Sequence, residues 1–354
     1  MAENEVQEVE PKASILSQAR ARKDEILAGL PEDDPLFAAA AAASSYIAQA
    51  QNPNTERAYS SDWKDFEAWC GSKGLKALPA VPTTVALYAG ELASVRNLRP
   101  ATVTRRLTAI NNRHREHDLD LPASRVHLVV SRTIQGIYKE KGRKQVGKKP
   151  LTVELLQKMI SSASGTLAAS RDRALFLVGF AGGLRRSELA AIDVEDLHPH
   201  KAGITIEIPR SKTDQQGEGR EVELVYGSQP EITPLHELTC PVRALEQWLK
   251  QANITEGKVL RKVSYAQTVG KSLDKDSIGR ILKRGLLRAG FTRAQVKEYS
   301  GHSMRAGFAT EAFNRGAREV EIMRQTGHRS RKTLEKYIRK EKLARQAAAA
   351  KLGL

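Results

Sequence analysis

The sequence predicts a mainly α-helical protein with a small antiparallel β-sheet, built as a helical N-terminal domain followed by a mixed α/β domain. Apolar residues recur at helical spacing through 36–141 and through most of 151–340. Segments 204–208 and 221–225 alternate apolar and polar residues around a polar turn that contains glycine, which is the pattern of a β-hairpin. A strongly basic run at 139–149 separates the two regions.

The N-terminal region contains five predicted helices. Thr55 is a suitable N-cap for the second of them, and Pro100 suits the first turn of the fourth. The preceding residues 1–35 hold nine acids and four bases, so we expect a mobile acidic arm or a loosely docked helix there. The predicted helices span 36–51, 55–70, 83–95, 100–117 and 123–141.

The basic run contains six bases, one acid and two glycines. It is either a solvated linker or a segment that lies along phosphates. We place the linker at 142–150, the second domain at 151–340 and a basic, then alanine-rich, tail at 341–354. The helices predicted in the second domain lie at 152–163 and 169–181 before the hairpin, and at 241–252, 274–289, 303–315, 318–325 and 331–340 after it.

Charge and composition narrow the classes of partner. The chain of 354 residues has a net charge of +16, and residues 36–354 alone carry +21, which favours a polyanionic partner. The two cysteines, Cys70 and Cys240, are 170 residues apart, so we expect reduced core thiols and a cytoplasmic protein. The acidic N-terminus is unlike a secretory signal, and the longest apolar stretch is too short to span a bilayer.

Two predicted helices place arginines opposite an apolar face. Arg105 and Arg106 do so in 100–117, and Arg280 and Arg284 are spaced four apart in 274–289. Either face alone could be a solvated surface, but two such faces in separate domains of a basic protein favour DNA binding. The candidate DNA-binding residues are Arg57, Arg105, Arg106, Arg280 and Arg284.

Four short segments of the second domain carry candidate catalytic residues. The chain has no phosphate-binding GxxxxGK[ST] loop, no HExxH and no cluster of Cys and His, so we expect neither a cofactor nor a metal. An enzyme that acts on DNA phosphodiesters without a metal requires cationic side chains around phosphorus and a side-chain nucleophile. In chain order the segments are 182–189 with Arg185 and Glu188, 210–213 with Lys212, 300–307 with His302 and Arg305, and 327–337 with His328 and Tyr337.

The order and spacing of these residues resemble the catalytic set of the tyrosine recombinases, the phage integrase family. The resemblance covers roughly residues 40–340, and within the family segment 300–307 is most similar to Cre recombinase. His328 departs from Cre, which has a tryptophan there, and matches the commoner choice of the family.

The resemblance implies a role for each residue. Arg185 and Arg305 would hold the non-bridging phosphate oxygens, and His302 would help to move the tyrosine proton. Lys212 would protonate the departing 5′-oxygen, while Tyr337 attacks phosphorus and leaves a 3′-phosphotyrosine. Glu188 and His328 complete the set, with Glu188 orienting its neighbours rather than transferring protons.

Alternatives remain for three positions. Arg186 could bind phosphate in place of Arg185, Lys212 could be an ordinary turn lysine, and Tyr337 could be a core tyrosine beside Leu334. The Gly-Leu-Arg register favours Arg185, and the upstream motifs favour a catalytic Tyr337.

The resemblance also implies an architecture and partners. A core-binding domain and a catalytic domain would close around double-stranded DNA. A homotetramer would join two sites, each a paired inverted repeat, without metal or ATP. The tail 341–354 is a candidate for docking on a neighbouring protomer, and the protein would lie in the cytoplasm on the nucleoid. A type IB topoisomerase and a DNA-binding regulator without catalysis are the alternative functions.

Overall fold

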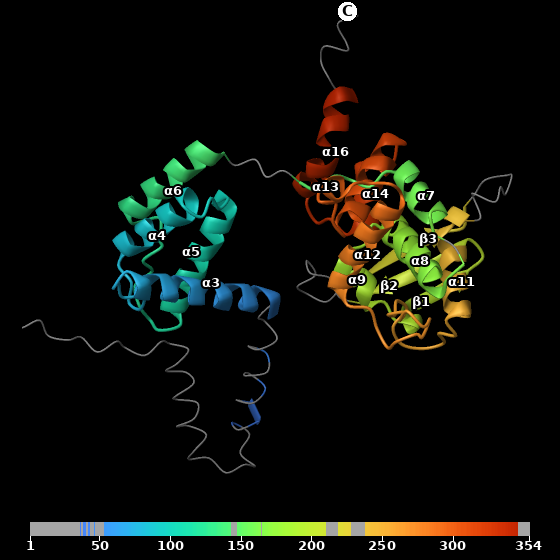
Figure 1. The fold of residues 1–354 in the computed structure, drawn as a ribbon, viewed down its shortest axis with the longest axis horizontal. Coiled ribbons are helices and arrows are strands. Elements are labelled where there is room, and N and C mark those ends of the chain that lie inside the picture. The colour runs from blue at the N-terminus through green and yellow to red at the C-terminus, as the bar shows by residue number, and fades with distance from the viewer. Residues whose placement is uncertain are drawn as a thin grey trace, which may run out of the picture. The chain divides into compact units, whose positions relative to one another are not determined.

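The computed structural model describes residues 53–142, 147–163, 165–209, 219–227 and 238–345, with isolated positions between 36 and 46; of 339–345 it describes only the backbone. The chain divides into two compact units, residues 1–145 and 146–354 (Figure 1). The predicted arm at 1–35, most of the predicted helix 36–51, part of the basic linker, the turn with Lys212 and the end of the tail lie outside the described residues.

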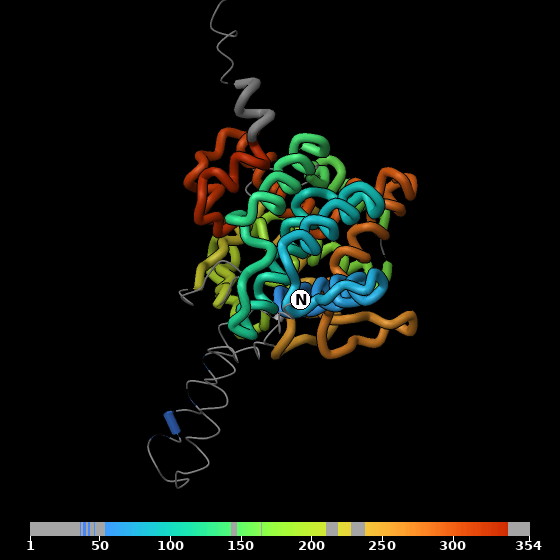
Figure 2. The backbone as a smooth tube through the Cα atoms, turned by 90° about the vertical axis from the view of Figure 1, so that its left-hand side faces the viewer, coloured from blue at the N-terminus to red at the C-terminus, as the bar shows by residue number. Residues whose placement is uncertain are grey.

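The first unit is helical, with α3 (Pro53–Ser72), α4 (Pro82–Ser94), α5 (Pro100–Arg115) and α6 (Leu128–Lys141) as its described helices (Figure 2, blue to green). Helix α3 packs on α5, and α4 packs on α6. Their core holds a cluster of aromatic rings from Trp63, Phe66, Trp69 and Tyr88. Helix α6 begins five residues later than the predicted 123 because His127 has an extended backbone.

The second unit is built around α8 (Leu167–Ala181), whose residues 174–180 are all buried. This second half of the helix is apolar on all sides, which suits such a central place. Five helices pack against it, namely α7 (Val153–Ser161), α9 (Arg186–Ala191), α11 (Pro241–Gln251), α12 (Lys275–Arg288) and α14 (Ser303–Asn314). The remaining described helices are the 3₁₀ turn η1 (Val194–Asp196), α13 (Arg293–Val296), α15 (Glu319–Thr326) and α16 (Arg331–Arg345).

A three-stranded antiparallel sheet completes the second unit, in the order β1 (Leu197–His200), β2 (Gly203–Ile208) and β3 (Arg220–Val225). Ile204 lies opposite Leu224 and Ile206 opposite Val222, and all four side chains are buried. The predicted fold class, mainly α with a small antiparallel sheet, is therefore confirmed. Strand β1 was not predicted, because its Leu-His-Pro-His sequence does not alternate; it is an edge strand, where proline is tolerated.

Helix α16 is fixed by a separate small core. Leu334 and Ile338 of α16 are fully buried with Ala309 of α14 and Ile322 of α15. Tyr337 lies one turn after Leu334 and packs against this cluster, so the buried Leu334 and Ile338 fix the turn of the helix that carries it. Cys70 and Cys240 are buried free thiols, and none of the described helices has the length and apolarity needed to cross a membrane.

Candidate active site

A turn between α8 and α9 that contains Gly183 places Arg185 at the start of α9. Gly183 has a φ of 56°, and a Cβ there would lie 2.8 Å from the Thr326 side chain and 3.0 Å from Phe308. Glycine is thus required for both conformation and space. The turn leaves Arg185 as the N-cap of α9, where its backbone N–H donates to Glu188 Oε2 at 2.9 Å.

Glu188 is a buried carboxylate that binds two arginines. Its Oε1 accepts from Arg185 Nη1 at 2.5 Å, and its Oε2 accepts from Arg220 Nη2 at 2.9 Å. Burial would raise the pKa of Glu188, but the backbone hydrogen bond from Arg185 and the charges of Arg220 and Arg185 outweigh it, so the pKa is lowered. Glu188 is therefore an anion at neutral pH, when it has no proton to donate, and its expected role of orienting its neighbours stays a prediction.

Arg305 lies at the bottom of the site, with only 1% of its surface exposed. Its Nη1 donates to the carbonyls of Gly183, at 2.8 Å, and of Thr326. Burial, followed by the charge of Arg185, lowers the pKa of Arg305 to about 10, so it stays charged at neutral pH. Its Nη2 is buried and has no hydrogen-bond partner among the described residues. A buried donor without a partner is costly, and an anionic oxygen would satisfy it.

His302 and Tyr337 meet through a hydrogen bond of 2.5 Å between Nε2 and the tyrosine hydroxyl, although 35 residues separate them. Partial desolvation, followed by the charges of Arg305 and Arg185, lowers the pKa of His302. The imidazole is therefore neutral at neutral pH and accepts the hydrogen bond that Tyr337 donates. Burial raises the pKa of Tyr337 against the opposing charges of Arg305 and Arg185, so the phenol keeps its proton in the DNA-free protein.

His328 is held in one tautomer by Thr326. Thr326 Oγ1 donates to the Ile322 carbonyl at 2.5 Å, so it accepts from His328 Nδ1–H at 2.7 Å. Nε2 is then left without a proton, and the imidazole ring lies 5.6 Å from the Tyr337 ring. Burial, followed by the charges of Arg305 and Arg185, lowers the pKa of His328 to about 3.

His328 is expected to stay neutral in the DNA-free protein from about pH 8 to about pH 5. Its pKa of about 3 lies below the ordinary 6.5, so the folded state takes up a proton only at strongly acidic pH. Histidine labelled with ¹³C at Cε1 would report this by NMR, with His328→Gln assigning the resonance. A resonance of His328 that titrates with a midpoint near 6.5 would contradict this environment.

The site thus joins six of the seven predicted catalytic residues in the second unit, while Lys212 lies outside the described residues. Arg220 is part of the site and was not predicted. It lies at the start of β3, with 14% of its side chain exposed. In the sequence nothing distinguishes this arginine from one on the surface, so it could not be predicted. The phosphate-binding and proton-transfer roles of these residues remain proposals.

The predicted DNA-binding arginines occupy different environments. Arg57 is exposed on α3. Arg280 and Arg284 are exposed on α12, opposite the buried Ile281 and Leu282. Their role in DNA binding stays a prediction.

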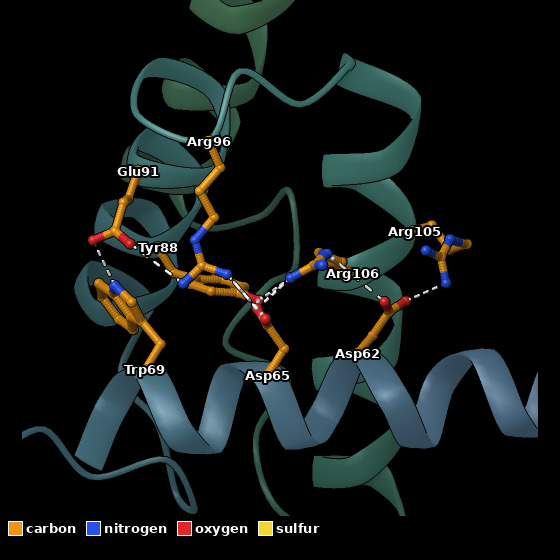
Figure 3. A network of polar contacts seen from close by, with 8 residues as sticks. All are labelled: Asp62, Asp65, Trp69, Tyr88, Glu91, Arg96, Arg105 and Arg106. Atoms are coloured by element: carbon orange, nitrogen blue, oxygen red, sulfur yellow. Dashed lines mark hydrogen bonds and ion pairs between the residues drawn. The ribbon is translucent and has the colours of Figure 1, made fainter. Parts of the chain in front are cut away.

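Arg105 and Arg106 belong to a network between α3, α4 and α5 (Figure 3). Arg105 is 43% exposed and donates to the buried Asp62 at 2.5 Å. Arg106 is only 18% exposed and contacts Asp62, Asp65 and the Tyr88 hydroxyl, which lies 2.8 Å away. The structure therefore does not place Arg106 among the exposed arginines, because two carboxylates of α3 hold it inside the unit.

Arg105→Gln and Arg106→Gln are accordingly expected to differ. Arg106→Gln removes the cation that lies between Asp62 and Asp65, which then keep only Arg105 and Arg96, and should lower the free energy of unfolding by about 1–3 kcal/mol. Arg105→Gln should cost less than about 1 kcal/mol of stability, because its ion pair is exposed on one side. It should instead weaken DNA binding. Urea unfolding and DNA titration of both variants measure the two effects, and equal effects on stability and on affinity would refute the division.

Comparison with known proteins identifies the family to which this fold and site belong. Residues 149–343, more than half of the chain, match the phage integrase family. A protein of Selenomonas ruminantium described as an integrase/recombinase xerD homolog is 37% identical over 293 residues, covering 80% of this chain and 81% of the relative. Tyrosine recombinase XerC of Myxococcus xanthus is 28% identical over 299 residues, covering 81% of this chain and 87% of the relative.

Solved structures agree in fold. XerH site-specific recombinase in a post-cleavage complex with palindromic difH substrate superposes with a TM-score of 0.53 at 17% identity, covering 76% of this chain and 72% of XerH.

The family match and the named relatives show that the protein is a tyrosine recombinase, an enzyme of DNA strand exchange. The chain belongs to the phage integrase family. The predicted family and the predicted function, site-specific DNA recombination, are confirmed, and the alternatives of a type IB topoisomerase and a non-catalytic regulator are not favoured.

Proposed function

We propose that this recombinase cleaves DNA through Tyr337 and needs neither metal nor ATP. The observation that carries the proposal is the Tyr337 hydroxyl donating to His302 Nε2 in the same site as the buried Nη2 of Arg305, which has no hydrogen-bond partner within the described part of the chain. The tyrosine oxygen forms a bond to phosphorus, and the bond from phosphorus to the 5′-oxygen breaks. The tyrosine proton passes to His302, and Lys212 donates a proton to the departing 5′-oxygen. One phosphate ester replaces another, so the reverse reaction can rejoin a different strand.

The two arginines stabilise the charge that grows on the non-bridging oxygens during attack. Arg305 offers Nη2, while Arg185 is oriented by the anionic Glu188. Guanidinium groups suit this task because they stay charged and match phosphate geometry. His328 has no proton on Nε2 in the DNA-free protein, so donation to phosphate requires protonation of the ring or a change to the other tautomer. The negative charge of bound phosphate favours that protonation.

We further propose that the substrate is a pair of DNA sites, each an inverted repeat, joined by a homotetramer. The exposed arginines Arg57, Arg105, Arg280 and Arg284 support contact with DNA in both units, and the net charge of +16 has the matching sign. Helix α16 continues past Tyr337 to Arg345, so the first residues of the tail follow the nucleophile within one helix, and we propose that the tail docks on a neighbouring protomer. We also propose that residues 142–150 are the linker between the two domains. The protein is proposed to lie on the nucleoid.

A plasmid test separates recombination from simple strand passage. Inverted repeats with a spacer of about 6–8 base pairs, taken from DNA flanking the gene, are cloned once or twice into a supercoiled plasmid. We expect recombinant products only with two sites, through a complex of four protomers whose mass is measured directly. Relaxation of the one-site plasmid without recombination of the two-site plasmid would instead indicate topoisomerase activity.

A further inference from the structure

Arg220 connects two parts of the active site that are distant in the sequence. Its Nη2 donates to Glu188 Oε2 at 2.9 Å, and its Nη1 donates to the Gln325 carbonyl at 2.6 Å. Arg220 therefore ties the start of α9 to the end of α15. Burial, partly offset by Glu188, lowers its pKa, and the nearby charge of Arg185 adds to the effect.

The C-terminal end of α15 holds three arginines through three consecutive carbonyls. The last carbonyls of a helix have no intrahelical partner and form the negative end of its dipole, so they attract cations. The pairs are Gln325 with Arg220, Thr326 with Arg305, and Gly327 with Arg185, the last at 3.4 Å. The helix end thus sets the spacing of the two proposed phosphate-binding arginines, with Arg220 as the third member.

Gly327 provides the room for this arrangement. Its φ of 65° is a left-handed conformation that ends the helix, and a Cβ there would lie 2.7 Å from Arg220 Nε. A side chain at this position would push Arg220 away from Glu188 as well as strain the backbone.

We propose that Arg220 is a positioning residue for DNA cleavage, which fixes Glu188 and thereby holds the Arg185 guanidinium on the scissile phosphate. The inference rests on the proposed role of Arg185. Glu188 Oε2 accepts from both the Arg185 backbone and Arg220, while Oε1 accepts from the Arg185 side chain. Without Arg220, only contacts with Arg185 itself remain among these three. The carboxylate then turns more freely, so Arg185 is oriented less firmly on its Glu188 side, although the Gly327 carbonyl still accepts from it.

The test is single-turnover cleavage of a nicked suicide substrate at saturating protein, compared among wild type, Arg220→Gln, Arg220→Lys, Glu188→Gln and the double variant Glu188→Gln/Arg220→Gln. We expect Arg220→Gln to slow cleavage by up to about 100-fold, since small misplacements of a binding group have effects of that size. DNA affinity should change little. Arg220→Lys should restore little, because one ammonium cannot span Gln325 and Glu188. The double variant should be as slow as Glu188→Gln within about twofold, because both changes release the same arginine.

Arg171→Gln is the matched control, because Arg171 is a buried arginine of the same unit whose ion pair, with Asp172, lies in α8. It should lower the melting temperature yet cleave at the wild-type rate per folded molecule. Wild-type cleavage by Arg220→Gln, or rate losses that multiply in the double variant, would overturn the positioning role. Absence of a covalent complex with the wild-type protein would instead overturn the proposed function, so the two failures are distinct.

Discussion

Tyr337→Phe is expected to bind DNA as tightly as the wild-type protein and to form no covalent complex with it. The ring packs against the small core of α14, α15 and α16, and phenylalanine keeps that packing. The hydroxyl is the group that attacks phosphorus in the proposed mechanism, and no water or second nucleophile can replace it without changing the product. Recombination should therefore fall below detection.

A nicked suicide substrate, on which cleavage cannot be reversed, makes this loss measurable on a denaturing gel. Tyr226→Phe serves as the control, because Tyr226 lies just after β3 and its hydroxyl donates to Glu246 at 2.7 Å. It should form the complex at the wild-type rate. A covalent band from Tyr337→Phe would show that another side chain is the nucleophile.

Lys212→Ala is expected to cleave ordinary DNA about 10²–10⁴-fold more slowly, the usual contribution of a positioned acid. The departing 5′-oxygen is a poor leaving group unless it receives a proton. A sulfur at that bridging position leaves as a thiolate, which needs no proton. Lys212→Ala should therefore recover most of its loss on a 5′-phosphorothiolate substrate, measured as the ratio of cleavage rate constants on the two substrates.

Arg185→Ala provides the comparison for Lys212, because its proposed task concerns the non-bridging oxygens, which the sulfur leaves in place. Its rate should not be restored to the same extent. Equal impairment of Lys212→Ala on both substrates would make Lys212 a phosphate contact or a turn residue. His302, which already accepts a hydrogen bond from Tyr337, would then be the first candidate for the acid.

Elements with strong periodicity were predictable from the sequence, and elements held by neighbours were not. The helix predicted at 274–289 corresponds to α12 at Lys275–Arg288, because its apolar residues repeat at helical spacing. Helix α9, with six residues, is too short to show a period. Strand β1 forms by backbone pairing with β2, and the side-chain pattern of β1 itself does not predict a strand.

The candidate site shows the same division. The resemblance in motif order predicted that His302 and Tyr337 act together. Local sequence patterns alone could not have predicted this contact, because the two residues are 35 positions apart. Arg106 looked like its neighbour Arg105 in the sequence. Its internal partners Asp62 and Asp65 lie on another helix, so only the folded unit distinguishes the two arginines. Arg220 was missed for a similar reason, since its partners Glu188 and Gln325 belong to distant segments.

The most direct test of the account is to identify the residue that carries DNA after cleavage. Wild-type protein is trapped on the nicked substrate, digested with protease and nuclease, and its peptides are sequenced by mass spectrometry. The account predicts a nucleotide attached through a 3′-phosphate to Tyr337 and to no other residue. A nucleotide on a different side chain, a 5′-phosphate linkage, or recombination without any covalent peptide would contradict it.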